Sequence, residues 1–144
     1  MILVLGLLAV AFVLVGGVSA RNRIVTLEKA CDSSASGVDV QLRRRHDLIP
    51  TLVETVRGFA AHESAVLERL TDARNRAICG DGSEREVEGA LRSVVATAER
   101  YPELTSARAF RDLQAELVDT EDRIAAARRF HAANVRDFNV AIET

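Results

Sequence analysis

The chain has 144 residues, a formal net charge of −2, one tyrosine and no tryptophan. Its 19 basic and 21 acidic residues are interspersed, so no large basic face for binding nucleic acid is expected. The two cysteines, Cys31 and Cys79, form neither a CxxC pair nor a metal-ligand cluster, which suits a structural role in a reducing compartment. We therefore expect no metal ion or other cofactor.

Residues 1–20 carry no charged side chain and are followed by Arg21 and Arg23. A span of about 20 apolar residues, at roughly 1.5 Å per residue, matches the ~30 Å hydrocarbon core of a bilayer, which predicts a single-pass transmembrane helix in the cell membrane. Because the cations lie only on its carboxyl side, we expect the amino terminus outside and the rest of the chain in the cytoplasm. The alternative is a cleaved signal peptide, since Val18-Ser19-Ala20 resembles a cleavage site. The length of the run and the lack of a preceding cation favour a retained anchor.

Residues 21–37 are predicted to form a juxtamembrane helical connector, and residues 38–144 a helical bundle. From Val38 to Ala77, apolar residues recur at spacings that alternate between three and four, which indicates one stripe along a helix. Pro50 lacks an amide proton and is expected to kink this helix near residues 46–49.

Cys79-Gly80-Asp81-Gly82 is a clear helix stop, and Ser83 with Glu86 forms a capping box that predicts a second helix over 83–101. Pro102 should end it, and a last helix is expected from about Ser106 to Ala141. The predicted fold is all-α: an N-terminal transmembrane helix followed by an antiparallel, coiled-coil-like bundle of three to four helices.

The expected helix lengths are compatible with a bundle of either three or four helices. Residues 38–79 and 105–143 would each extend about 60 Å, whereas 83–101 would extend only about 28 Å. A turn near Gly58 removes this mismatch, and we favour it, although the heptad pattern passes through Gly58 unbroken. In either arrangement, part of a two-helix stripe stays uncovered, which predicts a homo-oligomer or a partner in the membrane or cell envelope.

Several motifs between residues 38 and 143 resemble the LemA family and occur in the same order. They include Asp39-Val40-Gln41-Leu42, Asp47-Leu48-Ile49-Pro50, Gly58-Phe59-Ala60, Tyr101-Pro102 and Arg123-Ile124-Ala125. The resemblance implies one amino-terminal membrane helix and a cytoplasmic helical bundle with no established catalytic activity. Phe130-His131 departs from the usual Tyr-Asn, and the chain lacks the usual carboxyl-terminal extension.

The candidate interaction residues are polar positions on or beside the apolar stripes. Arg45 lies on the stripe and is expected to pair with an acid, whereas Glu63, if buried there, would need a cation partner or would have to be neutral. Neither a zincin HExxH nor a Glu-x-x-His spacing occurs, so no metal site is expected. The set comprises Arg44, Arg45, Asp47, His62, Glu63, Thr120, Glu121 and Arg123.

These features favour a non-catalytic, membrane-anchored scaffold or adaptor of the bacterial envelope, with no small-molecule substrate. Polar positions on the stripe would then fix helix register and oligomer state. The alternative is a ligand-binding or sensory module in which Arg44, Arg45, His62 and Glu63 form a pocket. An enzyme would need Glu99, Glu121 and Asp122 to meet in a cleft, which the sequence gives no reason to expect.

Overall fold

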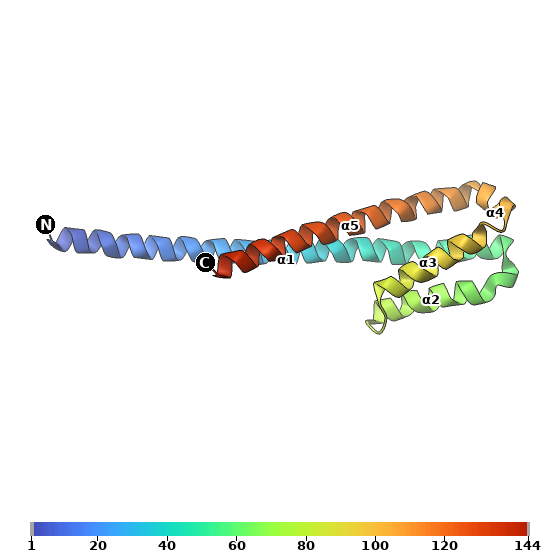
Figure 1. Cartoon of the computed structure of the whole chain (residues 1–144), viewed down its shortest axis with the longest axis horizontal. Helices are drawn as coiled ribbons and strands as arrows, with labels where there is room; N and C mark the ends of the chain where they lie inside the picture. Colours follow the sequence, from blue (N-terminus) through green and yellow to red (C-terminus); the bar gives the residue numbers. More distant parts are fainter. Residues whose placement is uncertain (1, 144) are drawn as a thin grey trace. The chain divides into compact units, whose positions relative to one another are not determined.

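The computed structural model describes the backbone of residues 2–143, and the side chains of these residues except 2–13, 15 and 20. Within this described part the secondary structure is entirely helical, which confirms the predicted all-α class (Figure 1). The elements are α1 (Ile2–Phe59), η1 (Ala61–Glu63), α2 (Ser64–Cys79), α3 (Glu84–Ala98), α4 (Pro102–Ser106) and α5 (Arg108–Glu143).

The turn predicted near Gly58 is confirmed, since α1 ends at Phe59 and α2 begins at Ser64. Four principal helices, α1, α2, α3 and α5, therefore form in the described residues, with the short α4 before α5. The chain divides into two compact units, Val40–Arg123 and a second unit of Met1–Asp39 with Ile124–Thr144. Each unit is described by itself below.

Proline 50 lies inside α1, and the helix continues through it. A proline at this position cannot donate to the carbonyl oxygen of His46, four residues earlier. Arg74 of α2 supplies the missing donor, because its Nε lies 2.7 Å from the His46 oxygen. A side chain from the neighbouring helix thus satisfies the backbone group that the proline leaves unpaired.

The turns between the helices are formed by capping and proline residues that are recognisable in the sequence. Gly80 ends α2 in the left-handed region with φ 81°, where glycine has no steric penalty. Ser83 begins α3, and its hydroxyl accepts a hydrogen bond from the Glu86 amide at 3.3 Å, which confirms the predicted cap. Pro102 opens α4 at its first turn, where a missing amide proton costs nothing.

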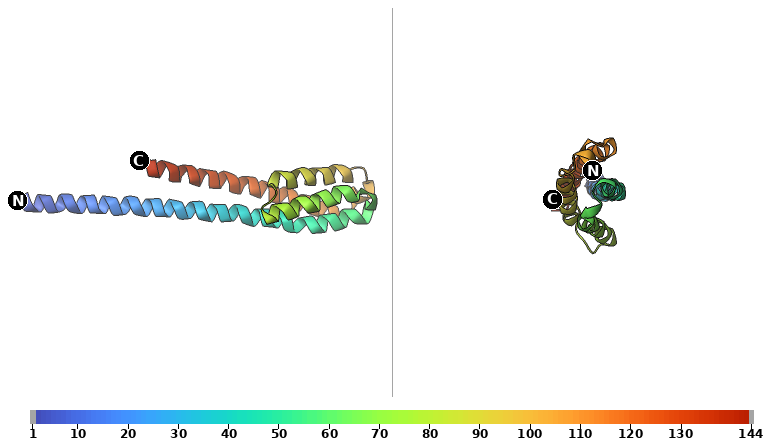
Figure 2. Two further views of the ribbon diagram at one scale, coloured as in Figure 1. Left: turned by 90° about the horizontal axis from the view of Figure 1, so that it is seen from below. Right: turned by 90° about the vertical axis from the view of Figure 1, so that its right-hand side faces the viewer.

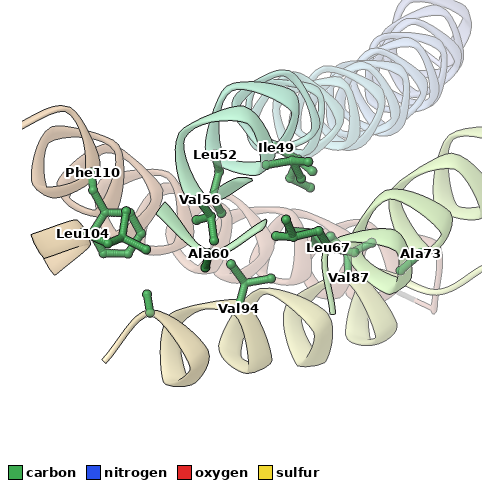
Figure 3. Close-up of a cluster of buried hydrophobic side chains, with 13 residues drawn as sticks. Ile49, Leu52, Val56, Ala60, Leu67, Ala73, Val87, Val94, Leu104 and Phe110 are labelled. Atoms are coloured by element: carbon green, nitrogen blue, oxygen red, sulfur yellow. The ribbon is translucent and has the colours of Figure 1, made fainter. Parts of the chain in front are cut away.

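The core of the unit Val40–Arg123 is apolar and combines residues from all four principal helices. Ile49, Leu67, Val94 and Phe110, from α1, α2, α3 and α5, are each no more than 1% exposed. Figure 3 shows these buried side chains pointing into the space between the helices, with Leu104 of α4 beside Phe110. In Figure 2 the green α2 and yellow α3 lie as a hairpin alongside the end of α1. Most of the heptad stripe predicted from Val38 to Ala77 lies in or against this core, as Ile49, Leu52, Val56, Leu70 and Ala73 show. Phe59 was also predicted on the stripe, and this prediction is wrong, because α1 ends there and its side chain is 47% exposed.

The second unit contains the earlier part of α1 and the last part of α5. Two polar contacts join them: Ser34 Oγ lies 3.0 Å from His131 Nδ1, and Asn134 Nδ2 donates to the Ala30 oxygen at 3.3 Å. As residue numbers fall on α1 they rise on α5, so the two segments are antiparallel. Ser34 and Ile124 are buried, whereas most apolar positions of this unit remain half-exposed. Two helices alone leave its apolar stripe incompletely covered.

Among the residues that the structure describes, we find no helix with the length and apolar character needed to cross a membrane. The predicted anchor, residues 1–20, falls mainly on residues 1–13, 15 and 20, whose side chains lie outside the described set.

Candidate interaction site

An open groove runs between α3 and α5 in the unit Val40–Arg123. Its volume is about 970 Å³. It follows α3 from Glu88 to Glu99 and α5 from Arg111 to Asp122, which corresponds to three helical turns or about 17 Å. The apolar lining consists of Leu91, Val95, Ala96, Ala115, Leu117 and Val118. These dimensions suit the apolar face of one further helix.

Arg45 lines the groove from α1 and is held by two carboxylates. It is only 2% exposed, with Nη1 2.7 Å from Glu121 Oε2 and Nη2 bonded to Glu84. The ion-pair interpretation of this stripe position is confirmed. Since Glu84 and Glu121 lie on α3 and α5, this single arginine ties three helices together.

His46 completes this polar cluster and is also buried, at 6% exposed. Its Nε2 lies 3.0 Å from Glu84 Oε1 without the alignment of a hydrogen bond. Arg45 Nε is likewise buried without a hydrogen-bond partner among the described residues. Two carboxylates therefore face one guanidinium and one imidazole, and the cluster is charge-balanced or negative rather than a site for an anion.

The other candidate residues near the groove make local contacts. Arg44 pairs with Glu116 at 3.0 Å on the surface, and Arg123 with Asp119 at 2.7 Å one turn away on α5. Thr120 is completely buried, and its hydroxyl donates to the Glu116 carbonyl at 2.7 Å. Asp47 is exposed and makes no ion pair with any described residue. Exposed pairs of this kind contribute about 0–1 kcal/mol each.

Glu63 lies in η1, where it accepts hydrogen bonds from the residues that lead into α4. Arg100 Nη2 donates to its Oε1 at 2.8 Å, and the Tyr101 hydroxyl donates to the same oxygen at 3.0 Å. The expected cation partner of Glu63 is therefore present. The hydrogen bond to Glu63, followed by desolvation and the Glu63 charge, raises the pKa of Tyr101, whereas Arg100 opposes the shift. His62 is exposed beside it.

The pocket proposed from Arg44, Arg45, His62 and Glu63 is not formed. Of these four side chains only Arg45 lines the groove, whereas Glu63 joins η1 to the start of α4. In contrast, Glu99, Glu121 and Asp122 all line one groove, an arrangement that no sequence pattern predicts. Glu99 follows the end of α3 near α4, and Asp122 lies 14 residues into α5, about 21 Å from its start. They do not form a close acid pair.

Comparison with known proteins supports the family suggested by the motifs. A family model described as the LemA family matches residues 34–144, more than half of the chain. The chain belongs to the LemA family. No curated protein matches it. The match covers the whole groove of this LemA-family chain as well as the Arg45 cluster, the four residues Arg45, His46, Glu84 and Glu121.

Sequence reasoning missed the groove of this LemA-family bundle and four of its six apolar lining residues. Leu91 and Leu117 are on the predicted stripes and line the groove, whereas Leu113 and Ile124 of the same α5 stripe face inward. Val118 lies next to that stripe and is 63% exposed, so it faces outward beside the groove. A signal was present, because an exposed valine next to the small residue Ala115 on the outer face of a helix is typical of a contact surface.

Proposed function

We propose that this LemA-family protein is a membrane-anchored, non-catalytic scaffold or adaptor of the cell envelope that works by binding protein chains, including its own copies. The groove between α3 and α5 carries this proposal. Its lining combines six apolar residues with acidic and basic ones along three helical turns, which is the composition and length that suit an amphipathic helix.

The surroundings of the groove support binding rather than catalysis. The Glu121 carboxylate already pairs with Arg45, and about 20 Å of helix separates the levels of Glu99 and Asp122. Acid and base partners in catalysis must reach one proton at about 3 Å. Such a separation serves recognition along a helix better than chemistry at one point.

Membrane anchoring by residues 1–20 belongs to the same proposal and rests on the apolar sequence. Lysine at the positions of Ala9 and Val13 would each cost about 2.5–3.5 kcal/mol of insertion free energy. We expect the natural chain to resist alkaline extraction from membranes and the doubly substituted chain to be released. Equal retention of both chains would refute the anchor.

The cytoplasmic placement of the bundle is tested with Cys79, which is exposed. In a chain whose Cys31 is replaced by serine, a membrane-impermeant maleimide should label Cys79 only after the cells are permeabilised. Labelling of intact cells to the same extent would place the bundle outside.

The scaffold role is tested by the mass of the full chain in mild detergent, measured by size exclusion with light scattering. A discrete oligomer, or a monomer that cross-links in cells to one defined envelope protein, is expected. A monomer without any cross-linked protein would refute the role.

A further inference from the structure

The exposed side of the last part of α5 carries a second apolar stripe that no described helix covers. Ala126, Phe130 and Ala133 follow one another at spacings of four and three, which aligns them along one helix face. Phe130 is 63% exposed, an unusual position for a phenylalanine in a soluble helix. We call these three residues the Phe130 stripe.

Two arginines flank the Phe130 stripe. Arg129 and Arg136 are seven residues apart and therefore lie at almost the same angle around the helix. Both are exposed, and neither forms an ion pair with any residue the structure describes. The stripe is thus the apolar face of a helix with a basic edge, about 15 Å long from Ala126 to Arg136.

The groove between α3 and α5 has the complementary character. Its acidic residues outnumber its basic ones by five to three: Glu88, Glu99, Asp119, Glu121 and Asp122 against Arg45, Arg92 and Arg111. Asp119 and Glu121 already pair with arginines, as does Glu88 with Arg92. Glu99 and Asp122 are the lining acids without an ion pair among the described residues.

We propose that the groove of one copy binds the Phe130 stripe of a second copy, with Arg129 facing Asp122. This inference rests on the proposed function, since it names a second copy of the chain as the occupant of the same groove. The apolar lining of the groove would contact the apolar stripe, the unpaired Asp122 would face the unpaired Arg129, and the lengths of groove and stripe, about 17 and 15 Å, agree.

Phe130 follows Asp122, the last groove residue of α5, by only eight residues of the same uninterrupted helix, Arg108–Glu143. So short a segment leaves no connecting chain with which to return to the groove as its occupant, so we assign the occupant to a second copy. Groove and stripe consist of different residues, so the contact is either made twice in a two-fold symmetric pair or repeated head to tail in a ring or chain.

The test places the photoreactive residue p-benzoylphenylalanine at position 130 of the full chain in mild detergent. An equal amount of ¹⁵N-labelled chain is added before irradiation, and mass spectrometry identifies the linked peptides. We expect links between labelled and unlabelled copies that map to residues 88–122. The same probe at Ile142, which is 54% exposed but lies off the stripe, is the matched control and should give no links to that range.

Charge reversal provides the second arm. Asp122→Arg should lower the yield of these links about tenfold, because two like charges would then face each other, and Arg129→Glu in the same chain should restore it. Thr105→Arg, a new charge outside the groove, is expected to leave the yield unchanged.

Three outcomes would overturn the inference: links between two copies of residue 130, links only to a foreign protein, or a yield insensitive to Asp122→Arg. Oligomers that persist with links elsewhere would leave the scaffold role standing while removing this contact. A monomeric chain that links to no protein at all would remove both.

Discussion

Replacing Arg74 by methionine should destabilise the native protein, and most of that effect should vanish when Pro50 is also replaced by alanine. The Arg74 Nε donates to the His46 carbonyl at 2.7 Å, and His46 is buried. Hydrogen bonds that involve a charged group contribute about 1.5–3 kcal/mol, and a buried carbonyl without a partner costs about 1–3 kcal/mol. Methionine keeps the length of the side chain and removes the donor, so we expect a loss of about 2 kcal/mol.

Alanine at position 50 changes the partner of the same carbonyl. Its amide can donate to the His46 oxygen in the ordinary helical pattern, so the carbonyl no longer depends on Arg74. The single Pro50→Ala change should stabilise α1, since an interior proline costs up to about 3 kcal/mol relative to alanine. In that background Arg74→Met should cost less than about 1 kcal/mol, which gives a coupling energy of about 1–2 kcal/mol.

The assay is urea unfolding of the full chain in mild detergent, followed by circular dichroism at 222 nm for the four chains of the cycle. Arg69→Met is the matched control, because Arg69 is exposed on the same helix and should change stability by less than about 0.5 kcal/mol. Equal costs of Arg74→Met with proline or alanine at position 50 would refute the reasoning.

Three further predictions concern single sites. Tyr101 is the only tyrosine and there is no tryptophan, so absorbance at 295 nm follows its titration alone. The pKa of Tyr101 is raised above the ordinary value of about 10, so the neutral phenol stabilises the folded protein below pH ~10, and this stabilisation is lost as the pH rises through the raised pKa. Glu63→Gln removes the main cause of the shift and should lower the titration midpoint of Tyr101. Phe110→Ala should lower the free energy of unfolding by about 3–5 kcal/mol. Arg45→Met should lower it by less than about 2 kcal/mol, because the carboxylate partners of Arg45 are partly exposed. Equal urea midpoints for the two variants would contradict this. Gly89→Ala, where an added methyl group meets nothing within 4 Å, should stabilise α3 by about 0.5–1 kcal/mol, and a lower thermal midpoint would contradict this.

The parts of the fold that depend on neighbours in sequence were predictable. The alternation of three and four identified Ile49, Leu52 and Val56 as core residues, and all three are at most 1% exposed. The cap at Ser83 was also predictable, because its partner is only three residues away. Comparison of helix lengths located the turn near Gly58, since a bundle cannot leave a long helix without a neighbour.

For contacts between residues far apart in sequence, the sequence predicts the type of interaction but not which residue is the partner. The position of Arg45 on an apolar stripe demanded an acid, but its acids are 39 and 76 residues away. No sequence pattern predicts the hydrogen bond from Arg74 to the His46 carbonyl, because any donor on α2 that lies opposite this carbonyl could make it. The groove was missed for a related reason: its lining comes from α3 and α5, which are separate in sequence, and the distance between them depends on how the bundle packs.

The structure also changes which residues are expected to bind a partner. Arg45, Glu63 and Thr120 each find their partners within the unit Val40–Arg123. Arg45 and Glu63 join different elements of this unit, whereas Thr120 bonds within α5. A side chain whose hydrogen bonds are already made gains little from a second protein, and its loss is felt first as instability. The side chains that gain most are exposed apolar ones and unpaired charges, namely Phe130 and Asp122. Substitutions on the outer face of α5 and in the groove should therefore change binding without lowering stability. Substitutions on the heptad stripe should instead unfold the bundle before they alter its assembly.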